Sequence, residues 1–157
     1  MASTLHYLTV QDVLWINLQA TKKVHHFSYA RLEEATFYQY AYGNSNSLLP
    51  QAARFVRGFL KMHPLEAGNE VTAFIALMTF LRMNGRCISL SDSAAPQWFD
   101  LVAHGKDSAL DSIAAISHPI VDHHHDGKPD IRGFIQANMS EYPETIRTLA
   151  AITPVSG

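Results

Sequence analysis

The segment spanning residues 71–81 constrains the fold most, because on a helix it would be apolar around nearly its whole circumference. Such a wide apolar arc requires a helix that is buried on most sides. The segment follows Gly68-Asn69 and is closed by Asn84-Gly85, which is typical of a helix C-cap. It is about half as long as a bilayer crossing requires. The sequence therefore predicts a central buried helix and no transmembrane segment. Its apolar residues are Val71, Phe74, Ile75, Leu77, Met78 and Leu81.

Helical periodicity recurs along the rest of the chain and predicts an all-α fold. Thr9 and Asp12 have the spacing of a capping box before the first helix. Residues 22–29 are too short and mixed for a helix and predict a short hairpin or extended flap. We find no strand ladder, and residues 118–129 read as a polar loop. The predicted surrounding helices cover residues 10–21, 31–40, 50–62, a segment around Trp98, residues 108–116, and one or two stretches broken by Pro143.

Composition narrows the class of protein. The chain has 157 residues, 12 Lys+Arg against 14 Asp+Glu and a net charge of −2, which predicts one domain over residues 1–157 and argues against a nucleic-acid partner. Cys87 is the only cysteine, so a disulfide scaffold is excluded and we expect the thiol to pack. The first residues lack the basic and apolar regions of a signal peptide. We expect a cytoplasmic protein with no membrane partner.

The segment from His63 to the start of the central helix is the main candidate for chemistry. It reads His63-Pro64-Leu65-Glu66-Ala67-Gly68-Asn69-Glu70-Val71. A histidine before proline is held in a loop, and a helix that begins at Gly-Asn presents backbone N–H groups to an anion. A general base beside a phosphate cradle would suit phosphoryl transfer. The alternative is that His63-Pro64 is an interhelical elbow and Gly68 a packing position.

This segment resembles the signature of the Fic/Doc family, His-Pro-Phe-x-Asp/Glu-Gly-Asn-Lys/Gly-Arg followed by a long helix. The resemblance is strongest over residues 7–90 and less specific over 118–157. It implies an all-helical fold in which His63 takes a proton from a protein hydroxyl, while Gly68 and Asn69 cradle nucleotide phosphates. The flanking segments that are similar to Doc-type toxins in order and spacing are residues 7–14, 31–35, 52–62 and 80–85.

The resemblance also implies cofactors and partners. ATP and Mg²⁺ would be the cofactors of an active member, and AMP or phosphate would be transferred to a protein of the translation machinery. Toxin-type members are inhibited by a glutamate that an antitoxin or the same chain supplies. The only matching spacing here is Ser140 to Glu144, which contains Pro143. An antitoxin supplied in trans is therefore the partner that the resemblance favours.

Three positions depart from the family pattern where charge matters. Ala67 stands at the metal-ligand position, Val71 at the arginine position and Glu70 at the Lys/Gly position. Metal stabilisation of phosphoryl transfer is worth several kcal/mol, and arginine is a bidentate phosphate partner. The departures predict impaired or altered transfer. As an alternative, Glu70 lies one helical turn from Ala67 and could replace the missing metal ligand.

Two further functions remain open alongside impaired transfer. One is an active toxin-type AMP- or phosphotransferase with His63 as base, and the other is a non-catalytic helical interaction module. The flap residues His26, Phe27 and Tyr29 occupy the place where the family aligns a target peptide by strand addition. The alternative for Phe27 and Tyr29 is that they are tucked into the core.

A second histidine cluster is a candidate metal site. His123, His125 and Asp126 combine imidazole and carboxylate groups that suit Zn²⁺ or Ni²⁺. Consecutive histidines alternate in direction, so only about two of them could reach one ion. The alternative is a solvated turn.

Overall fold

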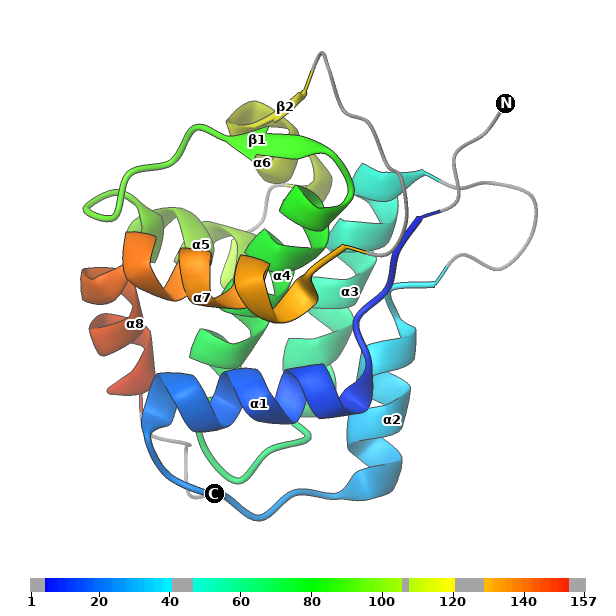
Figure 1. The fold of residues 1–157 in the computed structure, drawn as a ribbon, viewed down its shortest axis with the longest axis vertical. Helices are drawn as coiled ribbons and strands as arrows, with labels where there is room; N and C mark the ends of the chain where they lie inside the picture. The colour runs from blue at the N-terminus through cyan, green and yellow to red at the C-terminus, as the bar shows by residue number, and fades with distance from the viewer. Residues whose placement is uncertain (1–4, 41–46, 106–107, 121–128, 153–157) are drawn as a thin grey trace.

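The computed structural model describes residues 5–40, 47–105, 108–120 and 129–152, and it confirms the all-α class. Within those ranges the chain forms eight helices and one two-stranded sheet (Figure 1). The elements are α1 (Val10–Thr21), α2 (Tyr29–Phe37), α3 (Leu48–Met62), α4 (Asn69–Met83), β1 (Arg86–Ile88), α5 (Ala95–His104), α6 (Ala109–Ile116), β2 (Ser117–Pro119), α7 (Ile131–Glu141) and α8 (Pro143–Ala150).

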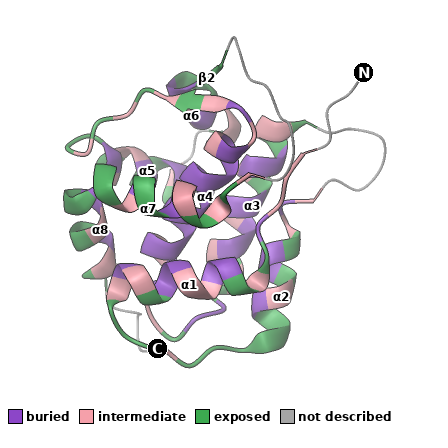
Figure 2. Ribbon diagram, viewed as in Figure 1, coloured by how far each residue is buried: buried purple, intermediate pink, exposed green. Residues whose placement is uncertain are grey.

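Helix α4 is the predicted central helix. Every residue from 71 to 81 is buried, and α1, α3, α7 and α8 all pack against it. Figure 2 shows α4 as a buried element enclosed by helices whose outer faces are exposed. The ring of Phe74 makes edge-on contacts with Phe99 at 5.5 Å and with Tyr142 at 5.2 Å between centroids. These contacts join α5 and the α7–α8 junction to the same core.

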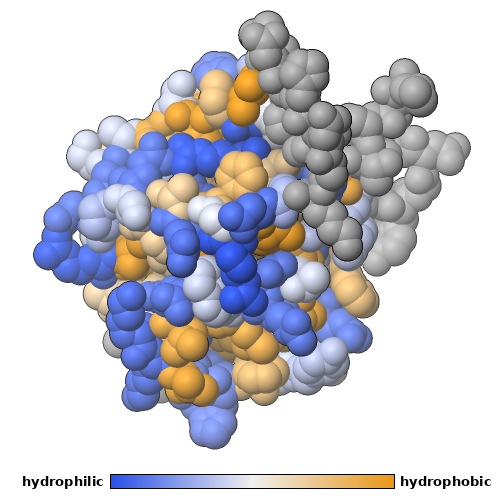
Figure 3. Space-filling model, viewed as in Figure 1, coloured by the Kyte–Doolittle hydropathy of each residue, from blue (hydrophilic) through white to orange (hydrophobic). Residues whose placement is uncertain are grey.

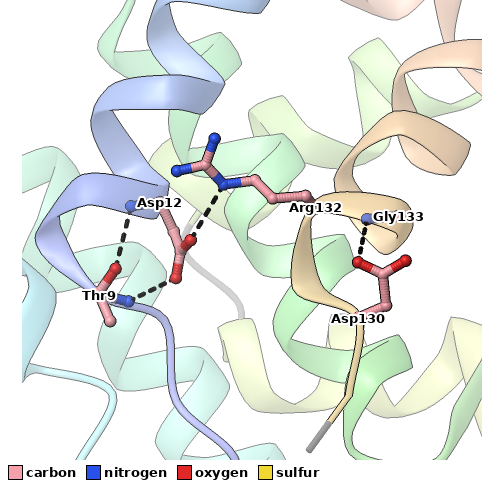
Figure 4. A network of polar contacts seen from close by, with 5 residues as sticks. All are labelled: Thr9, Asp12, Asp130, Arg132 and Gly133. Atoms are coloured by element: carbon pink, nitrogen blue, oxygen red, sulfur yellow. Dashed lines mark hydrogen bonds and ion pairs between the residues drawn. The ribbon is translucent and has the colours of Figure 1, made fainter.

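Helix α1 begins at the predicted capping box. The Thr9 hydroxyl accepts from the Asp12 N–H at 3.1 Å, and the Asp12 carboxylate accepts from the Thr9 N–H at 2.9 Å (Figure 4). Arg132 of α7 pairs with the same carboxylate at 3.4 Å. Asp130 caps α7 by accepting from the Gly133 N–H at 3.1 Å. The first turns of α1 and α7 are therefore held together.

The expectation of no strand ladder was wrong. Strands β1 and β2 pair antiparallel, with Cys87 opposite His118, and the Arg86 guanidinium donates to the Ser117 hydroxyl at 2.7 Å. Strands of three residues are too short to show an alternating pattern in the sequence. Cys87 is exposed, contrary to the expected packing, because neighbouring strand residues point to opposite faces and its neighbours hold the half-buried positions.

The boundary between the flap and α2 also differs from the prediction. Helix α2 begins at Tyr29 rather than near Arg31, because the Ser28 hydroxyl accepts from the Arg31 N–H at 3.3 Å and caps it. Tyr29 is thus a helical residue, and the flap shortens to residues 22–28.

The outer surface mixes residue types. On the face formed by α1 and α7, Figure 3 shows hydrophilic residues interspersed with apolar ones. Among the described helices, none combines the length and the apolar character that a membrane crossing demands.

Candidate functional site

His63 lies at the sharp turn between α3 and α4. Its N–H donates to the Phe59 carbonyl at 3.1 Å and ends α3, and its backbone is left-handed with φ of +50°. That conformation is uncommon for a residue with a side chain. Pro64 follows and prevents the helix from continuing. The His63 side chain is exposed, so its imidazole is accessible from solvent.

The loop after His63 is held by the side chain of Asn69. Its Oδ1 accepts from the Leu65 N–H at 3.0 Å, and its Nδ2 donates to the Leu65 carbonyl at 2.8 Å. Asn69 is 1 % exposed, and Leu65 is buried as well. The amide oxygen and one of the two amide N–H groups are therefore occupied by the loop, so the Asn69 side chain holds the loop in place.

Gly68 is required by the shape of this turn. Its φ is +78°, and an added Cβ would lie 2.7 Å from Cγ2 of Thr21 and 2.8 Å from Nδ2 of Asn17. Both distances are shorter than a carbon atom tolerates. Gly68 is the N-cap of α4, and the N–H groups of the first helical turn have no partner within the helix. Gly68 is therefore a packing position in this turn, and the anion site at the helix start stays a prediction.

Asn17 of α1 is a positioning residue that the sequence analysis did not single out. Its Nδ2 donates to the Ala67 carbonyl and to the Thr72 hydroxyl, each at 3.0 Å. Its Oδ1 lies 3.1 Å from Nδ1 of His25. Because an amide oxygen only accepts, this contact assigns the His25 proton to Nδ1. The available signal was a polar residue on the buried stripe of an amphipathic helix.

The flap runs antiparallel to the loop after His63. Phe27 forms a β-bridge with Leu65, the Glu66 N–H donates to the His26 carbonyl at 2.8 Å, and the Ser28 N–H donates to the Pro64 carbonyl at 3.2 Å. The flanking residues make both bonds, so the N–H and C=O of Phe27 point to the opposite edge of the flap.

The apolar side chains of the flap region face solvent. Phe27 is 43 % exposed and Tyr29 is 61 % exposed, so neither is tucked into the core. His26 is exposed beside them. Exposed aromatic rings next to an open backbone edge are features of a peptide-docking surface.

A hollow of about 400 Å³ brings His63 together with the flap. Arg31, on the first turn of α2, also lines it and donates to the Met62 carbonyl at 3.5 Å. Arg31 belongs to a flanking segment, residues 31–35, that resembles the family, but it was not among the predicted site residues. The lining residues are His26, Phe27, Ser28, Arg31, His63, Pro64, Leu65 and Glu66.

The three departures from the family pattern lie at the start of α4. Val71 is fully buried, and Ala67 contributes a carbonyl that already accepts from Asn17. Glu70 lies in the first turn and lines a separate hollow of about 180 Å³, which Asp100 of α5 also lines. His63 and Glu70 thus line different hollows, and the hypothesis that Glu70 replaces the metal ligand stays a prediction.

The electrostatics at the start of α4 are unfavourable for a phosphate. A carboxylate in the first turn interacts favourably with the helix dipole, which is the same interaction that an anionic ligand would use. Asp100 adds negative charge to the hollow that Glu70 lines. The residues present therefore do not fit a Mg²⁺-bound nucleotide phosphate well.

Metal sites of other kinds find no support in the described part of the chain. Within it, no group of three or more His, Cys, Asp or Glu residues could hold a metal ion. The candidate cluster of His123, His125 and Asp126 lies outside the described residues.

Comparison with known proteins adds one match. The model of the Fic/DOC family matches residues 4–81, which include α1 to α3, the turn at His63 and most of α4. Neither the comparison with curated proteins nor the comparison with solved structures found a match.

Proposed function

Because the chain belongs to the Fic/DOC family through residues 4–81, we propose that it is a Fic/Doc-like protein whose Mg²⁺-dependent transfer is impaired or altered. Membership in the family suggests a nucleotide transferase type of function. The reaction that we propose to be impaired moves AMP or phosphate from a nucleotide to a protein hydroxyl. The remaining function is binding of a protein partner along the flap.

The start of α4 is the observation that carries this proposal. Ala67 has no side-chain oxygen for a metal, Val71 is buried and apolar, and Glu70 adds a carboxylate to the first helical turn. Each loss of about 1.4 kcal/mol in transition-state stabilisation slows a reaction about tenfold. The absence of both the metal ligand and the arginine would remove several orders of magnitude from the rate.

The flap supports the binding function. The outward N–H and C=O of Phe27 can pair with an extended peptide, while the exposed rings of Phe27 and Tyr29 contact its side chains. A hydroxyl on that peptide would lie beside the hollow that contains His63. The His63 imidazole can accept the proton of that hydroxyl, or it can bind the hydroxyl through a hydrogen bond.

The decisive experiment measures transfer from labelled ATP to proteins of a cell lysate. We expect no labelling by the wild type and labelling by Ala67→Asp/Glu70→Lys. Adding Val71→Arg to the double variant would complete the family pattern. Because Val71 is fully buried, the double variant is the primary test. Circular dichroism checks that the triple variant is folded. His104→Ala, in the other hollow, is the matched control for His63→Ala. Labelling by the wild type that His63→Ala abolishes and His104→Ala preserves would overturn the proposal.

An active toxin-type transferase is the second candidate. The observation in its favour is Arg31, which provides a cation in the same hollow as His63. In that case ATP and Mg²⁺ are the cofactors, a cytoplasmic protein of the translation machinery is the target, and an antitoxin acts in trans. Arg31→Gln would then reduce labelling at least tenfold, as expected when a charged phosphate contact is lost.

Direct titration separates the remaining alternatives. If Glu70 replaces the missing metal ligand, Mg·ATP binds the wild type and Glu70→Gln weakens that binding only when Mg²⁺ is present. If the protein is a helical interaction module without a nucleotide site, calorimetry detects no ATP binding with or without Mg²⁺.

A further inference from the structure

Helix α3 carries a purely basic stripe on its outer surface. Arg54, Arg57 and Lys61 are spaced three and four residues apart, so they lie along one side of the helix. The sequence of α3 from Leu48 to Met62 contains no aspartate or glutamate. In a chain with a net charge of −2, this stripe concentrates positive charge on one surface.

The stripe lines a cavity of about 600 Å³ that is separate from the hollow around His63. The ring of Tyr38 covers Gly58 so closely that an added Cβ there would collide with it. Opposite α3, the cavity is lined by the N-cap and first residues of α6. None of the described lining residues carries a carboxylate, and they are Tyr38, Ala53, Arg54, Arg57, Gly58, Lys61, Ser108, Ala109 and Leu110.

Among the described residues, neutral carbonyl groups orient the Arg54 guanidinium. The Arg54 guanidinium donates to the carbonyls of Tyr38 and Tyr40, and neutral carbonyls orient a cation but leave its charge intact. Arg57 donates to the Gly105 carbonyl at 3.2 Å. The ion pairs among the described residues use other arginines, at positions 82, 132 and 147, and include neither Arg54 nor Lys61.

We propose that this cavity binds a small phosphate-bearing molecule, with its phosphate group between Arg54 and Lys61. The volume lies within the range of about 300–1,000 Å³ that is typical of small-molecule sites. A guanidinium presents parallel donors that match phosphate oxygens, and an ammonium adds a point charge. The cavity lies outside the turn at His63, so this site is independent of transfer chemistry.

The test is an NMR titration of ¹⁵N-labelled protein with inorganic phosphate and with glycerol phosphate, using glycerol as the uncharged control. We expect saturable shifts of the amides of Gly58, Lys61, Ala109 and Leu110 with both phosphates and none with glycerol. Shifts with inorganic phosphate alone would restrict the site to the free ion and overturn the proposal of an organic phosphate. Shifts confined to residues 69–71 would assign the phosphate to α4 and overturn the cavity site.

Charge variants separate a specific site from bulk attraction. Lys61→Gln and Arg54→Gln are each expected to weaken binding about tenfold. Arg147→Gln is the matched control, because it removes the same charge from an exposed side chain that pairs with Glu144 on α8. Arg54 also holds the end of α2, so its variant is checked by thermal melting, whereas Lys61→Gln alters no described hydrogen bond. Equal weakening of phosphate binding by Arg147→Gln would refute the cavity site. That result would not change the outcome of the ATP labelling experiment, so the two proposals can fail separately.

Discussion

Replacing Gly68 by alanine tests the geometry of the turn on which the candidate site depends. A left-handed backbone costs a non-glycine residue about 1–2 kcal/mol. The new Cβ would also lie 2.8 Å from Nδ2 of Asn17, which must move and weaken its two hydrogen bonds, to Ala67 and Thr72, at about 1 kcal/mol each. We expect Gly68→Ala to lower the free energy of unfolding by about 3–4 kcal/mol. That is a large share of the roughly 5–15 kcal/mol of a typical domain.

A double-mutant cycle isolates a further contribution, the contact of the new Cβ with Thr21. The added Cβ would lie 2.7 Å from Cγ2 of Thr21, and Thr21→Ser removes that methyl group but keeps the hydroxyl that donates to the Asn17 carbonyl at 2.8 Å. In the Thr21→Ser background, Gly68→Ala should therefore cost less than in the wild-type background, while the backbone strain and the contact with Asn17 remain. Urea denaturation followed by circular dichroism measures all four proteins. A cost below about 1 kcal/mol for Gly68→Ala in the wild-type background would refute the positive φ.

Three further substitutions test other contacts. Asn69→Ala should destabilise the fold by about 2–4 kcal/mol in urea melts, because it leaves the buried N–H and C=O of Leu65 unpaired. Burial and then the Glu141 charge raise the pKa of Tyr142 to about 12, so wild-type stability should fall between pH 10 and pH 12, and Tyr142→Phe should make that fall smaller. Burial raises the pKa of Asp92, but hydrogen bonds from Thr145 and from neighbouring N–H groups outweigh burial and lower that pKa overall. The stabilisation that the Asp92 carboxylate provides is therefore present above about pH 4 and is lost in acid. Asp92→Asn should flatten the acid limb of a plot of stability against pH.

The helices could be predicted from the sequence because their signals are local. The capping box before α1 and the apolar run of α4 depend on residues within one or two turns of each other. The ladder between β1 and β2 joins residues about 30 positions apart, and three-residue strands carry no periodic pattern. Helix α2 began earlier than predicted because Ser28, a strong N-cap residue, was read as part of the flap.

The candidate site could be predicted only in part. The turn at His63 is specified by consecutive residues, so the sequence predicts its position. The contacts of Asn17 with Ala67 and of His26 with Glu66 span 50 and 40 positions, and only the fold brings those segments together. Arg31 likewise lies in the hollow of His63 through the packing of α2 and not through any motif.

The left-handed backbone of His63 has an evolutionary consequence. Glycine would adopt the same conformation at a free energy lower by about 1 kcal/mol. Proteins tolerate costs of this size as long as they stay above their stability threshold. The use that we propose for the imidazole would offset this cost. In a lineage that abandoned the hollow, position 63 should be among the first residues of the turn to change.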